Sequence, residues 1–383
     1  MKKILVVHNS YKNIGGEDIA VKSEIELLKE KFEVETIIFD NILRNPIKQF
    51  FYFVLNSNLN SNKLILKKVE EFKPDIVYIH NTWYKVSLGI YQKLYKKNFQ
   101  VVIKLHNFRY FCTKNFLMKN HILEKDVCYA CNAKKTRIFN KYFKNSLLKS
   151  LLVIYYGKKF IKIIRNEELK LLVLTNFHKS FLINNKIRNK NIYVSRNYIE
   201  ALPKLNKEEI RNNKKYFVYA GRISEEKGVL ELIESFLKSN LDDIILKIIG
   251  DGPDFQYLKN KYESNKIEFL GEVSNEEVLL IISNSICVVT CTKIFEGQPT
   301  ILCEASSLGI PAIFPKTGGL LEFFPSNYEL CFTQFNYSEL EDLFKLFLDN
   351  DITKQIGKKN YLYYKENFNS NNLLLNFEKI LNE

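Results

Sequence analysis

The sequence predicts an α/β protein built from two parallel-sheet domains with a Rossmann-like alternation of strands and helices. Short runs rich in β-branched residues alternate with longer helical patterns along the chain, which is typical of repeated βα units. A polar, charged stretch from Glu200 to Lys215 interrupts this alternation once, and the pattern then restarts. The length of 383 residues also suits two domains.

Strands are expected on both sides of the interruption. Before it they are Ile4–His8, Val34–Phe39, Ile76–His80, Val101–His106, Leu171–Thr175 and Ile192–Ser195. After it they are Tyr216–Ala220, Ile244–Ile249, Ile267–Leu270, Ile286–Thr290, Pro311–Phe314 and Glu329–Phe332. We therefore expect domains at 1–199 and 200–365, facing a central cleft at the carboxyl ends of the strands. An amphipathic helix at about 366–383 is expected to end the chain and can pack back on the first domain.

Composition points to a globular protein without a membrane-spanning helix. Hydrophobic residues make up 46% of the chain, yet no apolar run approaches eighteen residues. The first apolar run stops after four residues, too early for a secretory signal, so it is interpreted as a strand. Of the seven cysteines, four (Cys287, Cys291, Cys303 and Cys331) fall in expected core elements. This usage suits a reducing cytoplasm.

The net charge of +14 indicates an acidic partner. No acidic residue occurs between Val127 and Asn166, whereas ten cations do: Lys134, Lys135, Arg137, Lys141, Lys144, Lys149, Lys158, Lys159, Lys162 and Arg165. Because apolar residues are interleaved with them, residues 134–165 are predicted to lie on an anionic membrane surface. The alternative is an ordinary surface helix. Nucleic-acid binding is not expected, since zinc-finger spacing, a recognised RNA-binding motif and a basic tail are all missing.

Two glutamates, Glu296 and Glu304, flank the expected start of a helix at Pro299. Proline suits a first helical turn because its φ is preset and its missing N–H would be unpaired there anyway. A helix N-terminus favours anions through its unpaired N–H groups and its dipole. Two acids beside an anion site suggest a ligand with both phosphates and hydroxyls, as in a nucleotide sugar.

Two further loops follow strands that begin a domain. Gly15 and Gly16 lie between the first strand and a helix, where their backbone can approach a phosphate closely. In the second domain Arg222 and Lys227 flank the equivalent loop, where a diphosphate would gain charge-assisted hydrogen bonds. The alternatives are an unremarkable βα turn for the glycines and solvated side chains for the two cations.

As a set, these motifs resemble those of the retaining nucleotide-sugar-dependent glycosyltransferases of family 4, which have the GT-B fold. The likeness covers nearly the whole chain. In order and spacing it is carried by Gly15-Gly16-Glu17, Gly221-Arg222 with Lys227-Gly228, Glu296-Gly297 with Pro299 and Glu304-Ala305, and Gly318-Gly319 followed by Glu322.

The resemblance implies a role for each of these residues. Arg222 and Lys227 would hold the donor diphosphate, Glu304 the ribose hydroxyls, and Gly16, beside Gly15, would meet the diphosphate from the other domain. Glu296 would grip the donor sugar together with the backbone of a short segment: Gly297, Gln298, Pro299 and Thr300. Gln298 departs from the apolar residue that many relatives carry, which leaves the donor sugar open.

His106 ends an expected strand of the first domain and should point into the cleft. In similar proteins this histidine lies near the reacting sugar, so His106 and Glu296 are our candidate catalytic residues. A capping histidine bonded to a neighbouring loop is the alternative. By resemblance, the leaving phosphate itself accepts the proton of the acceptor.

Cys112, Cys128 and Cys131 form a cluster, with His121 as a possible fourth ligand for a structural zinc. Free thiols and a redox or disulfide pair are the alternatives. The sequence Asp349-Asn-Asp351 falls between two helical patterns and is interpreted as a turn or cap, so no catalytic metal or other cofactor is expected.

The sequence thus predicts a retaining hexosyltransferase that uses a nucleoside-diphosphate sugar and acts on a glycan or a lipid-linked saccharide. Cell-surface polysaccharide assembly at the inner face of the membrane is its expected setting. The enzymatic alternatives are a phosphorylase or an epimerase of the same fold, and the non-enzymatic one is a degenerate binding subunit. A nucleic-acid-binding protein is a distant third.

Overall fold

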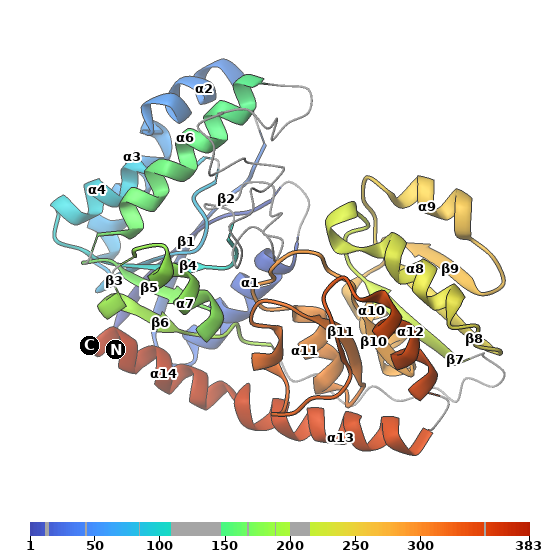
Figure 1. The fold of residues 1–383 in the computed structure, drawn as a ribbon. Helices are drawn as coiled ribbons and strands as arrows, with labels where there is room; N and C mark the ends of the chain where they lie inside the picture. Colours follow the sequence, from blue (N-terminus) through green and yellow to red (C-terminus); the bar gives the residue numbers. More distant parts are fainter. Residues whose placement is uncertain are drawn as a thin grey trace. The chain divides into compact units, whose positions relative to one another are not determined.

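The computed structural model describes residues 1–11, 15–42, 44–83, 85–108, 147–166, 168–187, 189–199, 215–347 and 350–383. These residues form two compact units. The N-terminal unit takes its described residues from 1–198 and from Ser370–Glu383, and the C-terminal unit takes them from Ile199–Asn369. Each unit is built around its own six-stranded parallel sheet (Figure 1).

The N-terminal sheet has the strand order β2-β1-β3-β4-β5-β6. Its strands are β1 (Lys3–Asn9), β2 (Glu33–Phe39), β3 (Ile76–Ile79), β4 (Gln100–Leu105), β5 (Lys170–Val173) and β6 (Ile192–Val194). The helices of this unit are α1 (Gly16–Lys29), α2 (Pro46–Leu55), α3 (Leu59–Phe72), α4 (Gly89–Lys96), α6 (Leu147–Ile164), α7 (Asn176–Asn184), the 3₁₀ turn η1 (Asn189–Asn191) and α14 (Ser370–Asn382).

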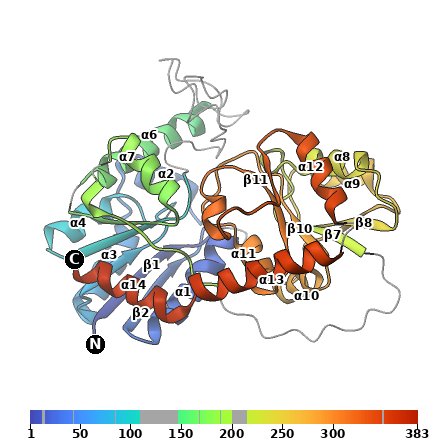
Figure 2. The ribbon, with the colours of Figure 1, turned by 60° about the horizontal axis from the view of Figure 1, so that its bottom comes forward.

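The central strands of this sheet are covered on both faces, which is why they contain continuous apolar runs. Ile4 to Val7 of β1 and Ile76 to Ile79 of β3 are fully buried. The last helix, α14, contributes Phe377 and Ile380 to the core formed by α1 and these strands. Figure 2 shows that α14, at the end of the chain, runs beside α1 and β1, which come from its beginning.

A buried polar cluster lies within the same core. Lys104 of β4 pairs with Glu24 of α1 at 2.7 Å, and the Tyr78 hydroxyl of β3 donates to the other oxygen of Glu24 at 2.8 Å. The Lys104 ammonium also donates to the Arg196 carbonyl at 3.4 Å. A buried charge is tolerated only when it is paired and hydrogen-bonded, and this cluster meets that condition.

The C-terminal sheet has the order β12-β11-β10-β7-β8-β9. Its strands are β7 (Lys215–Ala220), β8 (Ile244–Ile249), β9 (Ile267–Gly271), β10 (Cys287–Val289), β11 (Ala312–Lys316) and β12 (Cys331–Thr333). Its helical elements are η2 (Glu225–Lys227), α8 (Val229–Lys238), α9 (Phe255–Tyr262), α10 (Asn275–Ser283), α11 (Thr300–Ser307), η3 (Leu320–Phe323), α12 (Tyr337–Leu346) and α13 (Asn350–Asn367).

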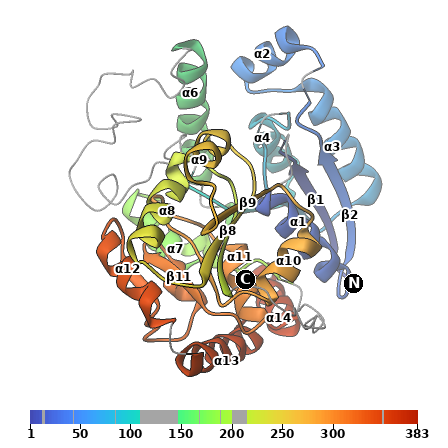
Figure 3. The same cartoon turned by 90° about the vertical axis from the view of Figure 1, so that its right-hand side faces the viewer.

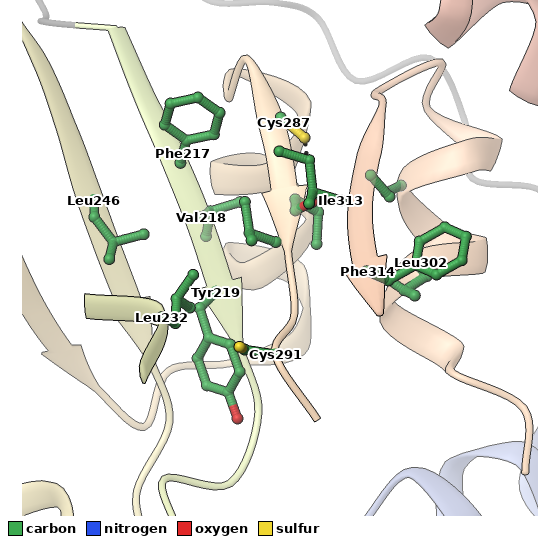
Figure 4. Packing of buried hydrophobic residues seen from close by; sticks show 14 of the residues in the cluster. Phe217, Val218, Tyr219, Leu232, Leu246, Cys287, Cys291, Leu302, Ile313 and Phe314 are labelled. Carbon is green, nitrogen blue, oxygen red and sulfur yellow. Dashed lines mark hydrogen bonds between the residues drawn. The ribbon is translucent and has the colours of Figure 1, made fainter. Parts of the chain in front are cut away.

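Side chains of β7, β10 and β11 pack against the covering helices to form the core of the C-terminal unit. Figure 4 shows Phe217 and Val218 on β7, Cys287 on β10, and Ile313 and Phe314 on β11, all within one hydrophobic cluster. The four cysteines expected in core elements are buried free thiols, as predicted.

The predicted fold class, two Rossmann-like parallel-sheet domains, is confirmed. Each expected strand is present, with ends that differ by at most two residues. One local detail differs: α11 begins at Thr300, so Pro299 is its N-cap instead of a residue of its first turn. None of the helices in the described ranges combines the length and the apolarity that crossing a bilayer requires.

Candidate active site

The loop after β7 is held close to the next strand by glycine. Gly221 has a φ of +153°, and a Cβ on Gly250 would come within 2.1 Å of the Gly221 carbonyl oxygen. A side chain is therefore excluded at position 250. Arg222 follows Gly221 and is exposed, while its carbonyl accepts a hydrogen bond from the Tyr219 hydroxyl at 2.8 Å. The backbone of Arg222, from which its side chain extends, is thus held at the carboxyl end of β7.

Lys227 and Glu296 form an ion pair, although they come from two different strand-end loops. Lys227 ends η2, and its ammonium lies 2.6 Å from a carboxylate oxygen of Glu296. The Thr292 hydroxyl donates to the same oxygen at 2.8 Å. Gly228 follows with a φ of +68°, and a Cβ there would come within 2.0 Å of the Cys291 carbonyl oxygen. The two loops therefore meet along both backbone and side chains.

Helix α11 begins beside this pair in the chain, at Thr300. No side chain caps it at Pro299, whose carbonyl accepts from the amides of Leu302 and Cys303. Glu304 is the fifth residue of α11, and burial raises the pKa of its carboxyl to about 7. Near neutral pH this group therefore exists in both its protonated and its ionised forms.

In the N-terminal unit, His106 follows β4 and contacts a second histidine. His80, which follows β3, lies with its Nδ1 2.9 Å from Nε2 of His106, and the two rings stack with centroids 5.2 Å apart. Burial lowers the pKa of His80 well below its usual value, and nearby His106, Lys104 and His8 lower it further. His80 is therefore neutral, and it orients the ring of His106.

Gly15 and Gly16 begin α1, with Gly15 at the N-cap. The Gly15 amide donates to the Asp18 carboxylate at 2.9 Å, and His8 Nε2 lies 2.9 Å from the other oxygen of Asp18. Burial alone would raise the pKa of Asp18, but its hydrogen bonds to His8, Gly15 and Tyr11 lower it overall. Gly15 has an extended φ of −125° and, if given a Cβ, no atom nearer than 4.0 Å. The fold therefore does not require a glycine at position 15.

The structure adds two residues that the sequence analysis did not single out. The Thr292 hydroxyl donates a hydrogen bond to the Glu296 carboxylate, and the ring of His80 is hydrogen-bonded to that of His106. A sequence signal for His80 existed, because three of the five histidines (His8, His80 and His106) end or follow buried β-branched runs. Since parallel strands end at one edge of a sheet, this pattern could have indicated that the three histidines are neighbours.

The predicted site residues divide between the two units: Gly15, Gly16 and His106 lie in the first, and Arg222, Lys227, Glu296 to Thr300 and Glu304 in the second. The proposed zinc cluster of Cys112, Cys128, Cys131 and His121 lies outside the described residues. Within the described ranges, no three His, Cys, Asp or Glu side chains are grouped as a metal site requires.

Residues 202–363 match the family model of the glycosyl transferases group 1. The uncharacterized glycosyltransferase MJ1069 of Methanocaldococcus jannaschii is 25% identical over 61% of this chain, which spans only 64% of that relative. The alpha-monoglucosyldiacylglycerol synthase of Acholeplasma laidlawii is 27% identical over 79% of this chain and 75% of its own length.

Solved structures extend the likeness to the whole chain. Anabaena Alr3699/HepE, in complex with UDP and glucose, matches with a TM-score of 0.71 at 15% identity, covering 100% of both chains. This identity establishes the fold only. The chain therefore has the two-domain fold of this GT-B structure, and its residues 202–363 are similar to the glycosyl transferases group 1.

Proposed function

We propose that this chain is a retaining glycosyltransferase that moves a hexose unit from a nucleoside-diphosphate sugar to a glycan or lipid-linked acceptor. Surface polysaccharide assembly at the inner face of the membrane is the setting we favour. The family match supports sugar transfer, and the UDP and glucose bound to the structural neighbour support the donor class.

One observation carries the proposal: Lys227 and Glu296 meet beside the start of α11. A diphosphate would compete with Glu296 for the Lys227 ammonium, because both are anionic oxygen ligands. Displaced from Lys227, the Glu296 carboxylate would accept hydrogen bonds from sugar hydroxyls, while Thr292 keeps it in position. Arg222 would add a second cation, and Glu304 would accept from the ribose hydroxyls.

The transfer would rest on positioning and on electrostatic stabilisation of the departing diphosphate. His106, oriented by His80, would bond a hydroxyl of the reacting sugar. Gly15 and Gly16 would bring the start of α1 to the diphosphate. No metal is needed for this chemistry, because the cations of the protein would balance the phosphate charge.

The first test is a thermal-shift screen of the purified protein against UDP, GDP, ADP and TDP and their sugars, with a chelator present. A ligand that binds only the folded state raises the melting temperature by mass action. We expect one nucleotide family to do so, and Lys227→Ala and Glu304→Ala to abolish the effect. Lys247→Ala is the control, because Lys247 also pairs with a glutamate, Glu268 at 3.4 Å, but within strands.

The second test is the anomeric configuration of the product, read from proton NMR coupling constants. A retaining enzyme gives the same configuration as the donor, and an inverted product would overturn that part of the proposal. A nucleotide shift without transfer to any acceptor would favour a binding subunit. Metal analysis of the purified chain decides whether the cysteine cluster holds zinc.

A further inference from the structure

Helix α2 carries large apolar side chains on its outer side. Ile47 is 73% exposed, Phe51 58% and Leu55 70%, and Val54 is also exposed. At 100° per residue these four positions occupy one side of the helix. The opposite side is buried through Phe53, whose ring packs on Trp83 and Tyr156. The helix is therefore packed on the unit through one side, and its exposed apolar residues lie on the other.

A third side of α2 is polar. Lys48, Gln49 and Tyr52 line a cavity of about 400 Å³. Arg44 and Lys85, from the neighbouring loops, line it as well. Its one carboxylate, Asp40, pairs with Lys85 and lies 3.6 Å from the Arg44 guanidinium. The rim of the apolar side therefore carries more positive than negative charge.

Helix α6 extends this surface. The Tyr155 hydroxyl donates to the Val54 carbonyl at 3.2 Å, so α6 lies directly against α2 (Figure 1). Leu148 and Tyr155 of α6 are exposed, and the Lys159 ammonium lies 4.4 Å from the centre of the Tyr155 ring. Together α2 and α6 contain five lysines, one and four respectively, and no acidic residue.

We propose that α2, with α6 beside it, is the surface by which this chain docks on an anionic membrane. The apolar side chains Ile47, Phe51, Val54 and Leu55 would enter the boundary between headgroups and acyl chains. The side chains of Lys48, Lys158, Lys159 and Lys162 would contact lipid phosphates. This surface rests on the proposed function only in that a lipid-linked acceptor would need the enzyme at the bilayer.

The charge around the exposed positions favours a lipid surface over a protein partner, although a protein groove can also accept the apolar side of a helix. The rim of these positions carries Arg44, Lys48 and Lys85 against one carboxylate, Asp40, and this excess of positive charge complements the phosphates of an anionic leaflet. The sequence predicts membrane contact through 134–165, of which 134–146 lie outside the described residues. The remaining part includes α6, and to it we add α2 as the source of the apolar anchor.

The test is flotation of the full chain with vesicles, made either of phosphatidylglycerol and phosphatidylcholine in equal parts or of phosphatidylcholine alone. We expect binding to the anionic vesicles that weakens as salt is added. Replacing Phe51→Gln and Leu55→Gln together should lower the partition coefficient at least about tenfold, because two large apolar side chains no longer enter the bilayer. Lys158→Gln with Lys162→Gln should weaken binding at low salt only.

The matched control is Leu375→Gln on α14, whose side chain is 57% exposed on another part of the same unit (Figure 3). It should bind vesicles like the wild type. Unchanged melting temperatures and unchanged nucleotide shifts in all variants would exclude unfolding as the cause of any loss.

Three outcomes would overturn the proposal. The wild type could ignore anionic vesicles while still binding nucleotide, in which case the docking surface fails and the transferase proposal stands. The Phe51/Leu55 variant could bind vesicles like the wild type. Light scattering could instead show that the wild type is a dimer and the Phe51/Leu55 variant a monomer. The apolar side of α2 would then be the interface with a second copy of the chain.

Discussion

The two units each contain a lysine–glutamate pair of nearly the same length, in opposite surroundings. Lys104 and Glu24 are 2.7 Å apart, with side chains 0% and 6% exposed. Lys227 and Glu296 are 2.6 Å apart, with side chains 28% and 22% exposed. The first pair joins β4 to α1 inside a core, and the second joins two loops at strand ends.

The difference shows that burial, more than contact distance, decides what an ion pair can do. Removing one partner of a buried pair leaves an uncompensated charge in a medium that cannot solvate it. A partly exposed pair can be opened at little cost, because water replaces the lost partner. Lys104 and Glu24 are therefore suited to holding the N-terminal unit together, and Lys227 and Glu296 to exchanging partners with a ligand.

The largest effect is expected from Lys104→Met. It leaves the Glu24 carboxylate buried without its cation, so the free energy of unfolding should fall by about 3–5 kcal/mol. Urea denaturation followed by circular dichroism measures this loss. Adding Glu24→Leu and Tyr78→Phe to the same chain removes the stranded polar groups and should restore most of the stability. A loss within about 1 kcal/mol for Lys104→Met would mean that the pair is not the closed cluster described above.

Glu304 offers a third environment, a buried carboxyl whose pKa burial alone raises to about 7. Its ordinary value is 4.5. The folded state thus keeps a proton that the unfolded state has released, so its contribution to stability is present below pH 4.5. That contribution is lost as the pH rises to about 7.

The stability difference between Glu304→Gln and the wild type should therefore change with pH in favour of the variant. Between pH 4.5 and pH 8 the change should be on the order of 3 kcal/mol. Urea titrations at several pH values measure it, since all other groups cancel in the difference. Glu272→Gln, an exposed position of the same unit, serves as control and should run parallel to the wild type. A parallel profile for Glu304→Gln would contradict the raised pKa.

Much of this picture followed from the sequence, and the rest depended on which segments meet. The strands were predictable because their β-branched runs recur between helical patterns, as in Ile244–Ile249. The contact of Lys227 with Glu296 was not, because 69 residues separate them. Lys104 lies in the apolar run from Val101 to Leu105. That run does not indicate which acidic residue would pair with the Lys104 ammonium. Pairing across a sheet or between loops is a tertiary property that one-dimensional periodicity does not encode.

Lys227→Met sharpens the contrast with Lys104→Met, because it should affect binding far more than stability. We expect the free energy of unfolding to change by less than about 1 kcal/mol. The dissociation constant for the preferred nucleoside diphosphate should rise about 30-fold, which corresponds to the loss of a charged hydrogen bond worth about 2 kcal/mol. Isothermal titration calorimetry measures the constant. Lys247→Met is the control and should leave it unchanged, and equal losses in both variants would remove the special role of Lys227.

The smallest effect is expected from His80→Phe. This variant tests whether His80 influences the ligand indirectly, by orienting His106. Phenylalanine keeps a ring in the buried position but removes the hydrogen bond between His80 Nδ1 and His106 Nε2. His106 then loses its orientation, so kcat for sugar transfer should fall about tenfold while KM for the donor stays within about twofold. The control is His178→Phe, because His178 is also buried in this unit and neither of its ring nitrogens has a hydrogen-bond partner among the described residues. If both variants lose activity equally, the effect comes from core packing. If only His80→Phe loses it, and through kcat alone, His80 positions His106 for the transfer step.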